Sequence, residues 1–271
     1  MEAQLQKRVQ RYGWDKAALF YETFWQQQLK PAQDLLLQMA AIQPGEKVLD
    51  IACGTGLVSF RAAEQTGATG FVLATDISDR MIEKATALSN EKNISNISFE
   101  RMDAEQLTCT DGSFDVVICA LGLMYVPDPS KAISEMHRVL KKGGRMVAAV
   151  WGERAHCGWA EIFEIVDKRV SSEVCPMFFQ LGTGNLLELH FEKAGFNQIS
   201  LARINTMLDY QSDDDACGAA FEGGPVALAY FKFSEDVKKE AREEYLHSIA
   251  SYRGGPSYNV PGEFVVAMAF K

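Results

Sequence analysis

Several features that mark well-known protein classes are absent from this sequence. The six cysteines are widely spaced and form no C-x-x-C pair, which fits neither a zinc site nor a disulfide framework. No apolar run reaches the roughly 18 residues of a membrane span. The first twenty residues mix charged with apolar residues, unlike a signal peptide. We therefore expect a cytoplasmic protein with reduced thiols, no membrane span and no metal site.

Positive charge is also scarce. The chain has 27 Lys and Arg against 36 Asp and Glu, a formal net charge of −9, and its pI is about 5.1. Proteins that bind DNA or RNA gain affinity by neutralising phosphates, which requires a basic surface. The charge balance therefore predicts no nucleic-acid partner and favours a small, neutral or cationic substrate. It says nothing about the oligomeric state.

The apolar segments predict the fold class. With 271 residues and 47% hydrophobic residues, the chain can bury one full core. Five predicted strands alternate with helices up to Trp151, which is typical of a doubly wound, Rossmann-like α/β sheet. Two more strands, predicted after the regular alternation stops, bring the sheet to seven. The strands are predicted at 47–52, 70–76, 97–101, 114–120, 145–151, 197–210 and 263–270.

The helices and the division of the chain follow from the same periodicity. Two short helices, broken near Pro31, are predicted within 15–42. Further helices are predicted at 57–66, 79–91, 130–141, 158–170, 185–194 and 234–252. We expect a single domain with N-terminal helices in 1–44, a core in 45–151 and a C-terminal part in 152–271, which carries a helical insertion at about 211–261.

A glycine-rich turn follows the first predicted strand. The segment VLDIACGTG runs from Val48 to Gly56, and two cofactors fit such a turn. In a dinucleotide-binding G-x-G-x-x-G pattern the third glycine packs helix against strand, but Ser59 stands there. Asp50 precedes the glycines, and a carboxylate in an apolar strand end is costly without a purpose. S-adenosylmethionine (SAM) carries no phosphate and has a cationic amino-acid end, so it is the second interpretation.

A longer series of motifs resembles one family. The series consists of VLDIACGTG, ATDIS, DAEQL, DGSFDVVICALGLMYVPDP and RVLKKGGRMV. It resembles the class I SAM-dependent methyltransferases, above all the group that includes the ubiquinone and menaquinone biosynthesis methyltransferases and many small-molecule methyltransferases. The resemblance covers about residues 45–150 and is weaker outside them. It implies transfer of a methyl group from SAM to an O, C, N or S atom of a small molecule by in-line displacement.

The resemblance also implies which residues bind SAM. Asp76 would accept hydrogen bonds from both ribose hydroxyls, because one carboxylate has two oxygens to offer. Asp103 would accept the adenine amino group, and the glycines would let the backbone approach the methionine part. The full set consists of Tyr21, Asp50, Ala52, Gly54, Gly56, Asp76, Ile77, Met81, Asp103, Ala104 and Ala120.

The acceptor side is less well defined. His156 lies five residues after Trp151, at the end of the sheet where an acceptor would bind, and is the candidate general base. Tyr125 and Trp151 are candidates for an aromatic acceptor pocket, although they could equally fill the core. The chain lacks the Asn/Asp-Pro-Pro-Tyr run associated with methylation of amide or amino nitrogens. Two alternatives stay open: an NAD-type oxidoreductase and a noncatalytic SAM-binding scaffold.

Overall fold

The computed structural model describes residues 2–171 and 175–271. Its centre is a sheet with the strand order β3-β2-β1-β4-β5-β8-β6, and the short β7 pairs with β8. The first five strands pair in parallel, and β8 runs antiparallel to β5 and β6. The predicted doubly wound fold is thereby confirmed. The strands are β1 (Lys47–Ile51), β2 (Phe71–Asp76), β3 (Ile97–Arg101), β4 (Phe114–Ala120), β5 (Leu140–Trp151), β6 (Asn197–Tyr210), β7 (Arg253–Gly254) and β8 (Ser257–Phe270).

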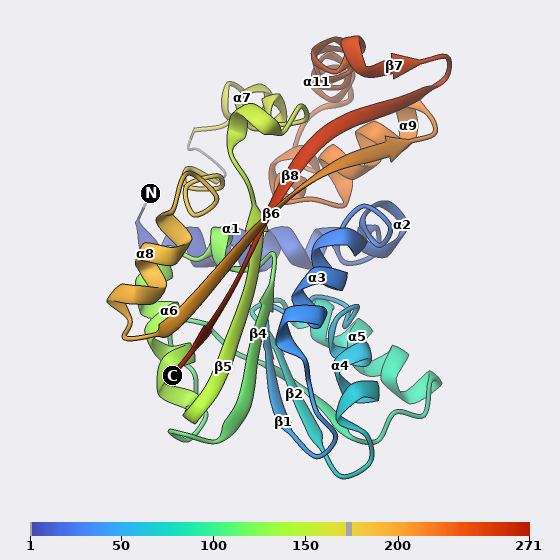
Figure 1. The fold of residues 1–271 in the computed structure, drawn as a ribbon. Coiled ribbons are helices and arrows are strands. Elements are labelled where there is room, and N and C mark those ends of the chain that lie inside the picture. The colour runs from blue at the N-terminus through green and yellow to red at the C-terminus, as the bar shows by residue number, and fades with distance from the viewer. Residues whose placement is uncertain (1, 172–174) are drawn as a thin grey trace.

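Helices cover both faces of the sheet. In Figure 1, α6 and α8 lie on one side of it, and α3, α4 and α5 lie on the other. Each of these five helices presents one buried face to the sheet, as its residue spacing predicts. The helices are α1 (Ala3–Ala17), α2 (Tyr21–Trp25), α3 (Lys30–Ala40), α4 (Ser59–Thr66), α5 (Asp79–Glu91), α6 (Pro129–Val139), α7 (Glu161–Asp167), α8 (Leu186–Lys193), α9 (Asp213–Cys217), α10 (Ala227–Tyr230) and α11 (Glu235–Ser248).

The N-terminal helix α1 was not predicted, and the reason is physical. Its buried residues are Gln6, Gln10, Gly13 and Ala17, so the buried face is polar or small and shows no apolar periodicity. The two predicted helices after it are α2 and α3. Pro31 lies in the first turn of α3, where its missing N–H has no helical partner to lose.

The last two long strands reach beyond the rest of the sheet. Figure 1 shows β6 and β8 continuing past β1, β2 and β4 into an upper region that holds α9, α11 and β7. Their register extends from Asn197 opposite Phe270 to Tyr210 opposite Tyr258. The prediction placed the start of β8 six residues too late, because Pro261 and Gly262 are poor strand residues. In the structure Pro261 nevertheless pairs with Met207.

A second boundary also differs from the prediction. Helix α6 ends at Val139, and β5 begins at Leu140 rather than at residue 145. Leu140 pairs with Phe114, and the register then shifts before Arg145 pairs with Val116. The three extra residues of β5 form an irregularity in the pairing, which sequence periodicity does not reveal because inserted residues interrupt the alternation of faces.

A buried carboxylate ties the end of β8 to its neighbours. Glu263 is 4% exposed and accepts hydrogen bonds from Arg203 Nη1 at 2.8 Å and from the backbone N–H of Glu153 at 3.0 Å. His156 Nδ1 lies 3.0 Å from its other oxygen. Burial by itself raises the pKa of Glu263, but the Glu153 hydrogen bond and the two basic neighbours outweigh it, so the pKa is lowered. We call this group the Glu263 clamp.

Residues 2–171 and 175–271 contain neither a membrane-spanning helix nor a cluster of metal-binding side chains. No helix in these ranges is long and apolar enough to cross a membrane. No group of three or more His, Cys, Asp or Glu side chains there could hold a metal ion. All six cysteines are free thiols.

Candidate cofactor and acceptor sites

A cavity of about 750 Å³ opens at the carboxyl ends of the parallel strands. It lies where the strand order reverses between β1 and β4, the position at which open α/β sheets bind ligands. We call it the first cavity. It is lined by Lys7, Gln10, Trp14, Tyr21, Ile51, Ala52, Gly54, Asp76, Ile77, Met81, Met102, Asp103, Ala104, Ala120, Leu121, Gly122, Tyr125, Val126 and Pro127.

The backbone approaches this cavity closely at two strand ends. Ala52 after β1 has φ +56° and Leu121 after β4 has φ +63°, both in the region that non-glycine residues rarely adopt. A Cβ added to Gly122 would lie 2.3 Å from the Cβ of Ala52, so only glycine fits there. Such strained residues gather at functional sites, where the surrounding fold holds them in place.

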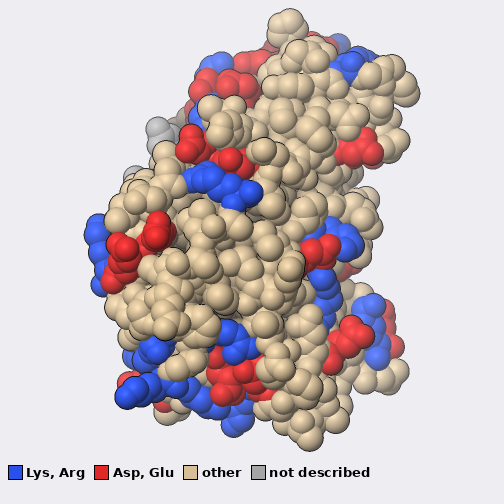
Figure 2. Space-filling model, viewed as in Figure 1, with Lys and Arg blue, Asp and Glu red and all other residues tan. Residues whose placement is uncertain are grey.

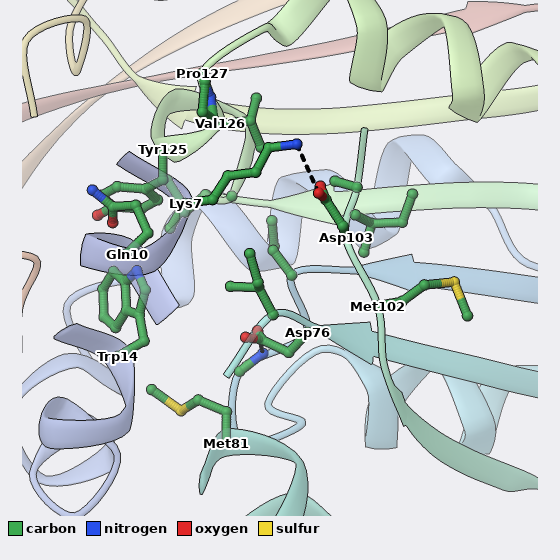
Figure 3. A pocket seen from close by; sticks show the side chains of 18 of the residues that line it. Lys7, Gln10, Trp14, Asp76, Met81, Met102, Asp103, Tyr125, Val126 and Pro127 are labelled. Atoms are coloured by element: carbon green, nitrogen blue, oxygen red, sulfur yellow. Dashed lines mark hydrogen bonds and ion pairs between the residues drawn. The ribbon is translucent and has the colours of Figure 1, made fainter. Parts of the chain in front are cut away.

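Asp76 at the end of β2 is a buried cavity residue. Its carboxylate accepts hydrogen bonds from the backbone N–H groups of Gly54 and Ser78, both at 2.9 Å. The side chain reaches the first cavity from below in Figure 3. Burial raises its pKa to about 6, although the backbone hydrogen bonds act in the opposite direction. The group is therefore mostly ionised at neutral pH and titrates just below it.

Asp50 lies deeper, in a small cavity of about 250 Å³ that it shares with Tyr21, Ala52 and Ala120. It is fully buried, and Ser59 Oγ donates a hydrogen bond to its Oδ2 at 2.5 Å. Its Oδ1 has no partner among the described residues. Burial raises its pKa to about 7. Ser59, which stands at the third glycine position of the dinucleotide pattern, thus holds this carboxylate.

The unpredicted helix α1 supplies one wall of the first cavity. Lys7, Gln10 and Trp14 face it in Figure 3. Lys7 Nζ lies 2.7 Å from Asp103 Oδ2 and 2.8 Å from Glu105 Oε2, so the helix is fastened to the loop after β3. The sequence analysis missed these residues because it missed the helix.

A second, aromatic cavity of about 360 Å³ adjoins the first. The two share Trp14, Tyr21, Leu121 and Tyr125 as walls. We call it the second cavity. Among residues 2–171 and 175–271, no charged side chain lines it. Its walls are Trp14, Tyr21, Trp25, Leu29, Leu121, Met124, Tyr125, Trp151, Trp159, Phe178, Gly224 and Pro225.

Ring contacts fix the shape of the second cavity. The ring of Trp151 lies 4.7 Å from that of Trp159 and 4.2 Å from that of Phe264. Tyr125 contacts Trp14 edge to face at 5.1 Å. Burial raises the pKa of Tyr21 and of Tyr125 well above the ordinary phenol value. Both phenols therefore stay protonated at neutral pH and can donate a hydrogen bond to a ligand.

Most of the predicted site residues line one of the three cavities, and two of them, Gly56 and His156, line none. Those found in the wall of the first cavity are Tyr21, Ala52, Gly54, Asp76, Ile77, Met81, Asp103, Ala104, Ala120 and Tyr125. Trp151 lines the second cavity, and Asp50 lines the small one. Gly56 lines none of these, but its φ of +93° and a Cβ position 2.9 Å from the Phe60 ring require glycine. His156 also lines none of them. Its side chain is 52% exposed and contacts Glu263.

The matching family and two relatives share one activity, methyl transfer. A methyltransferase-domain family matches residues 42–172. The chain is 34% identical over 197 residues to the ubiquinone/menaquinone biosynthesis C-methyltransferase UbiE of Shewanella oneidensis, covering 69% of this chain and 77% of that protein. It is 33% identical over 127 residues to the demethylmenaquinone methyltransferase of Listeria welshimeri, covering 47% of this chain and 54% of that one.

Solved structures share the fold. The phosphoethanolamine N-methyltransferase 2 of Haemonchus contortus, in complex with SAM, has a TM-score of 0.60 and 20% identity, and the match covers 95% of this chain and 57% of that one. The YcgJ protein of Bacillus subtilis has a TM-score of 0.63 and 18% identity, with 89% and 98% covered. At these identities the likeness concerns the fold alone.

The fold, the cavity at its switch point and these relatives define a SAM-dependent methyltransferase of class I. Within that class, the chain belongs to the family of UbiE-like methyltransferases. SAM is its cofactor and methyl transfer its reaction, so the oxidoreductase and scaffold alternatives are set aside. The first cavity suits this cofactor, because its wall combines the buried carboxylate of Asp76 with the glycine backbone at Gly54 and Gly122. Ser59 takes the place of the third glycine of a dinucleotide site.

We expect Asp50→Asn to stabilise the protein. The folded pKa of about 7 lies above the ordinary value of 3.8, so the ionised carboxylate costs free energy that grows as pH rises from about 4 to 7. Removing that charge should raise the free energy of unfolding by about 2 kcal/mol at pH 7.5, and by less at pH 4.5. Urea denaturation at the two pH values measures this.

The matched control is Asp111→Asn. Asp111 is 78% exposed and pairs with Arg138 at the surface, so its loss should change stability by about 0.5 kcal/mol at most. If Asp50→Asn destabilised the protein at pH 7.5, the Asp50 carboxylate would be a net structural support and our account of its cost would be wrong.

Proposed function

We propose that the protein methylates a ring carbon of an uncharged aromatic acceptor of the phenol or quinol class. The observation that carries this proposal is the second cavity, which joins the first through Trp14, Tyr21, Leu121 and Tyr125. None of the described residues that line it carries a charged side chain. A cationic or anionic acceptor would lose its hydration there without gaining a partner. An apolar ring would instead pack against several indole and phenol rings.

The relatives support the same acceptor class. Their names place them in ubiquinone and menaquinone biosynthesis, as a C-methyltransferase and a demethylmenaquinone methyltransferase, and quinone precursors are uncharged aromatic rings. The surface fits a small acceptor better than a nucleic acid. On the face seen in Figure 2, Lys and Arg side chains stand beside Asp and Glu in small groups, without a broad basic area.

We propose that the predicted cofactor residues in the first cavity hold SAM in the manner that the family resemblance implies. Asp76 accepts the ribose hydroxyls, and Asp103, already fastened by Lys7, accepts the adenine amino group. Ala52 and Gly54 have small side chains or none, so their backbone can lie directly against the methionine part of SAM. The methyl group then faces the shared wall of the two cavities.

The reaction needs alignment more than acid–base help. When bound, SAM would supply an activated methyl group that bonds to the ring carbon as the carbon–sulfur bond breaks. S-adenosylhomocysteine would leave, and the proton of the ring carbon would be released to solvent. The chain's part is to align the ring and exclude water. The buried phenols of Tyr21 and Tyr125 stay protonated, so they can hold an acceptor oxygen by a hydrogen bond but cannot serve as bases.

We expect SAM binding to weaken about tenfold between pH 7.5 and pH 5. The carboxyl of Asp76 has a pKa of about 6, so it is ionised above that value and protonated below it, where it accepts hydrogen bonds poorly. Isothermal titration across this pH range measures the effect. Asp76→Ala should weaken binding by about 1.5 to 3 kcal/mol at pH 7.5.

Two control variants distinguish the contribution of Asp76 to the pH dependence of SAM binding from that of Asp50. Asp76→Asn should bind weakly with little pH dependence, whereas Asp50→Asn should keep the pH dependence that Asp76 causes. Unchanged affinity in a folded Asp76→Ala variant would mean that Asp76 does not contact the cofactor.

The acceptor proposal is tested with a substrate panel and methyl-labelled SAM. The panel contains a reduced 2-alkyl-1,4-naphthoquinol, catechol, phosphoethanolamine and sarcosine. We expect transfer to the naphthoquinol, with kcat/KM at least about a hundredfold above that for the two charged amines, because those must desolvate a charge. NMR of the product should place the methyl group on carbon. Preferred transfer to either amine would contradict the proposal.

The prediction that His156 is the base is tested by His156→Ala. Since His156 lines neither cavity and contacts Glu263, we expect kcat to stay within about threefold of the wild type, well short of what loss of a general base would cost. His247→Ala, at an exposed position on α11, is the control. A loss of about a hundredfold or more in His156→Ala alone, with a changed pH profile, would make His156 the base after all.

A further inference from the structure

Several exposed apolar side chains lie on the N-terminal helix α1 or directly after it. Among residues 2–171 and 175–271, six large apolar side chains are exposed, and three of them are Leu5 at 38%, Tyr12 at 49% and Leu19 at 77%. A fourth, Phe231, is 38% exposed and follows α10, which packs on α1. Its ring stacks on that of Phe20 at 6.0 Å. An apolar concentration of this kind marks an interaction site.

Basic residues alternate with the apolar ones. Arg8 and Lys16 are exposed between Leu5, Tyr12 and Leu19. Intervals of three or four residues place Leu5, Arg8, Tyr12 and Lys16 on one face of α1, and Leu19 follows in the turn two residues after the helix ends. Neither cation forms an ion pair with any described residue. We call Leu5, Arg8, Tyr12, Lys16 and Leu19 the exposed stripe.

The acidic residues near the stripe are few and partly engaged. Glu2 is exposed one turn before it. Asp15, on the same helix, accepts hydrogen bonds from Ser78 Oγ at 2.7 Å and from the Arg80 backbone N–H at 3.1 Å. Beside Phe231, Lys232 is exposed and also has no ion pair among the described residues, and Glu235 begins α11 three residues later. The stripe is thus locally basic on a chain of net charge −9.

We propose that the exposed stripe docks the protein onto an anionic membrane surface. A helix that lies in the interface of a bilayer presents apolar and aromatic residues together with Lys and Arg, as this one does. Each cation near an anionic surface contributes about fivefold in binding. A purely electrostatic partner, such as a nucleic acid, would leave Leu5 and Leu19 without a function. The alternative partner is a second copy of this chain, which carries a net charge of −9, and the test below distinguishes it.

The opposite side of α1 gives the docking a consequence. Lys7, Gln10 and Trp14 line the first cavity. The exposed stripe lies on a different face of α1. If the stripe docks on a membrane, α1 therefore lies between the lipid surface and the first cavity. This inference concerns where the protein binds and does not depend on which acceptor it methylates.

The experiment measures vesicle binding by flotation. Full-length protein is mixed with vesicles of neutral phosphatidylcholine or of phosphatidylcholine with about 30% phosphatidylglycerol, at low and at 0.5 M NaCl. We expect at least about tenfold stronger binding to the anionic vesicles, lost at high salt. The double variant Arg8→Gln and Lys16→Gln should weaken binding by about 25-fold, and Leu19→Ser by about fivefold.

Matched controls lie elsewhere on the surface. Lys142→Gln removes an exposed cation, and Met207→Ser removes a side chain that is 53% exposed. Both should bind like the wild type, and all variants should keep wild-type SAM affinity as a check of folding. The proposal is overturned by three outcomes: no preference for anionic vesicles, equal losses in the control variants, or a dimer that Leu19→Ser dissociates in the absence of vesicle binding.

Discussion

The close approach of two strand ends is the constraint on which the rest of the structure depends. Ala52 at the end of β1 and Gly122 after β4 face each other so closely that a single added Cβ would collide. Beyond this point the chain diverges toward α4 on one side and toward η1 (Leu123–Tyr125) on the other. The divergence opens the first cavity, and the left-handed backbone at Ala52 and Leu121 is the strain that accompanies it.

Two buried carboxylates reflect a balance between stability and function. Asp50 and Asp76 stand at the ends of neighbouring apolar strands, where burial raises the pKa of each. A fold selected for stability alone would place apolar residues there. Ser59 and the backbone of Gly54 and Ser78 hold the two carboxylates in position. Strongly perturbed carboxyls in a cavity wall are typical of sites that bind ligands.

The acceptor side is assembled from parts far apart in the chain. Trp25 from α2, Trp151 from β5 and Trp159 before α7 meet around one cavity, and the Glu263 clamp ties β8 to the segment between Trp151 and Trp159. The cofactor side, in contrast, is built from consecutive strand ends. Substitutions on the acceptor side can therefore alter which acceptor binds without altering the residues that bind the cofactor.

The sequence by itself determined the succession of strands and helices along the chain, the glycine turn and the acids at the strand ends, because strand alternation and turn chemistry are local properties. It also carried the motifs that identify the cofactor. The order of the strands within the sheet came from the tertiary structure. Only the tertiary structure decided that α1 covers the cavity, since its buried residues Gln6, Gln10 and Gly13 show no apolar pattern. Likewise, only contacts between distant residues placed Trp151 in the second cavity and His156 beside Glu263. Such contacts depend on how elements pack, which no local pattern specifies.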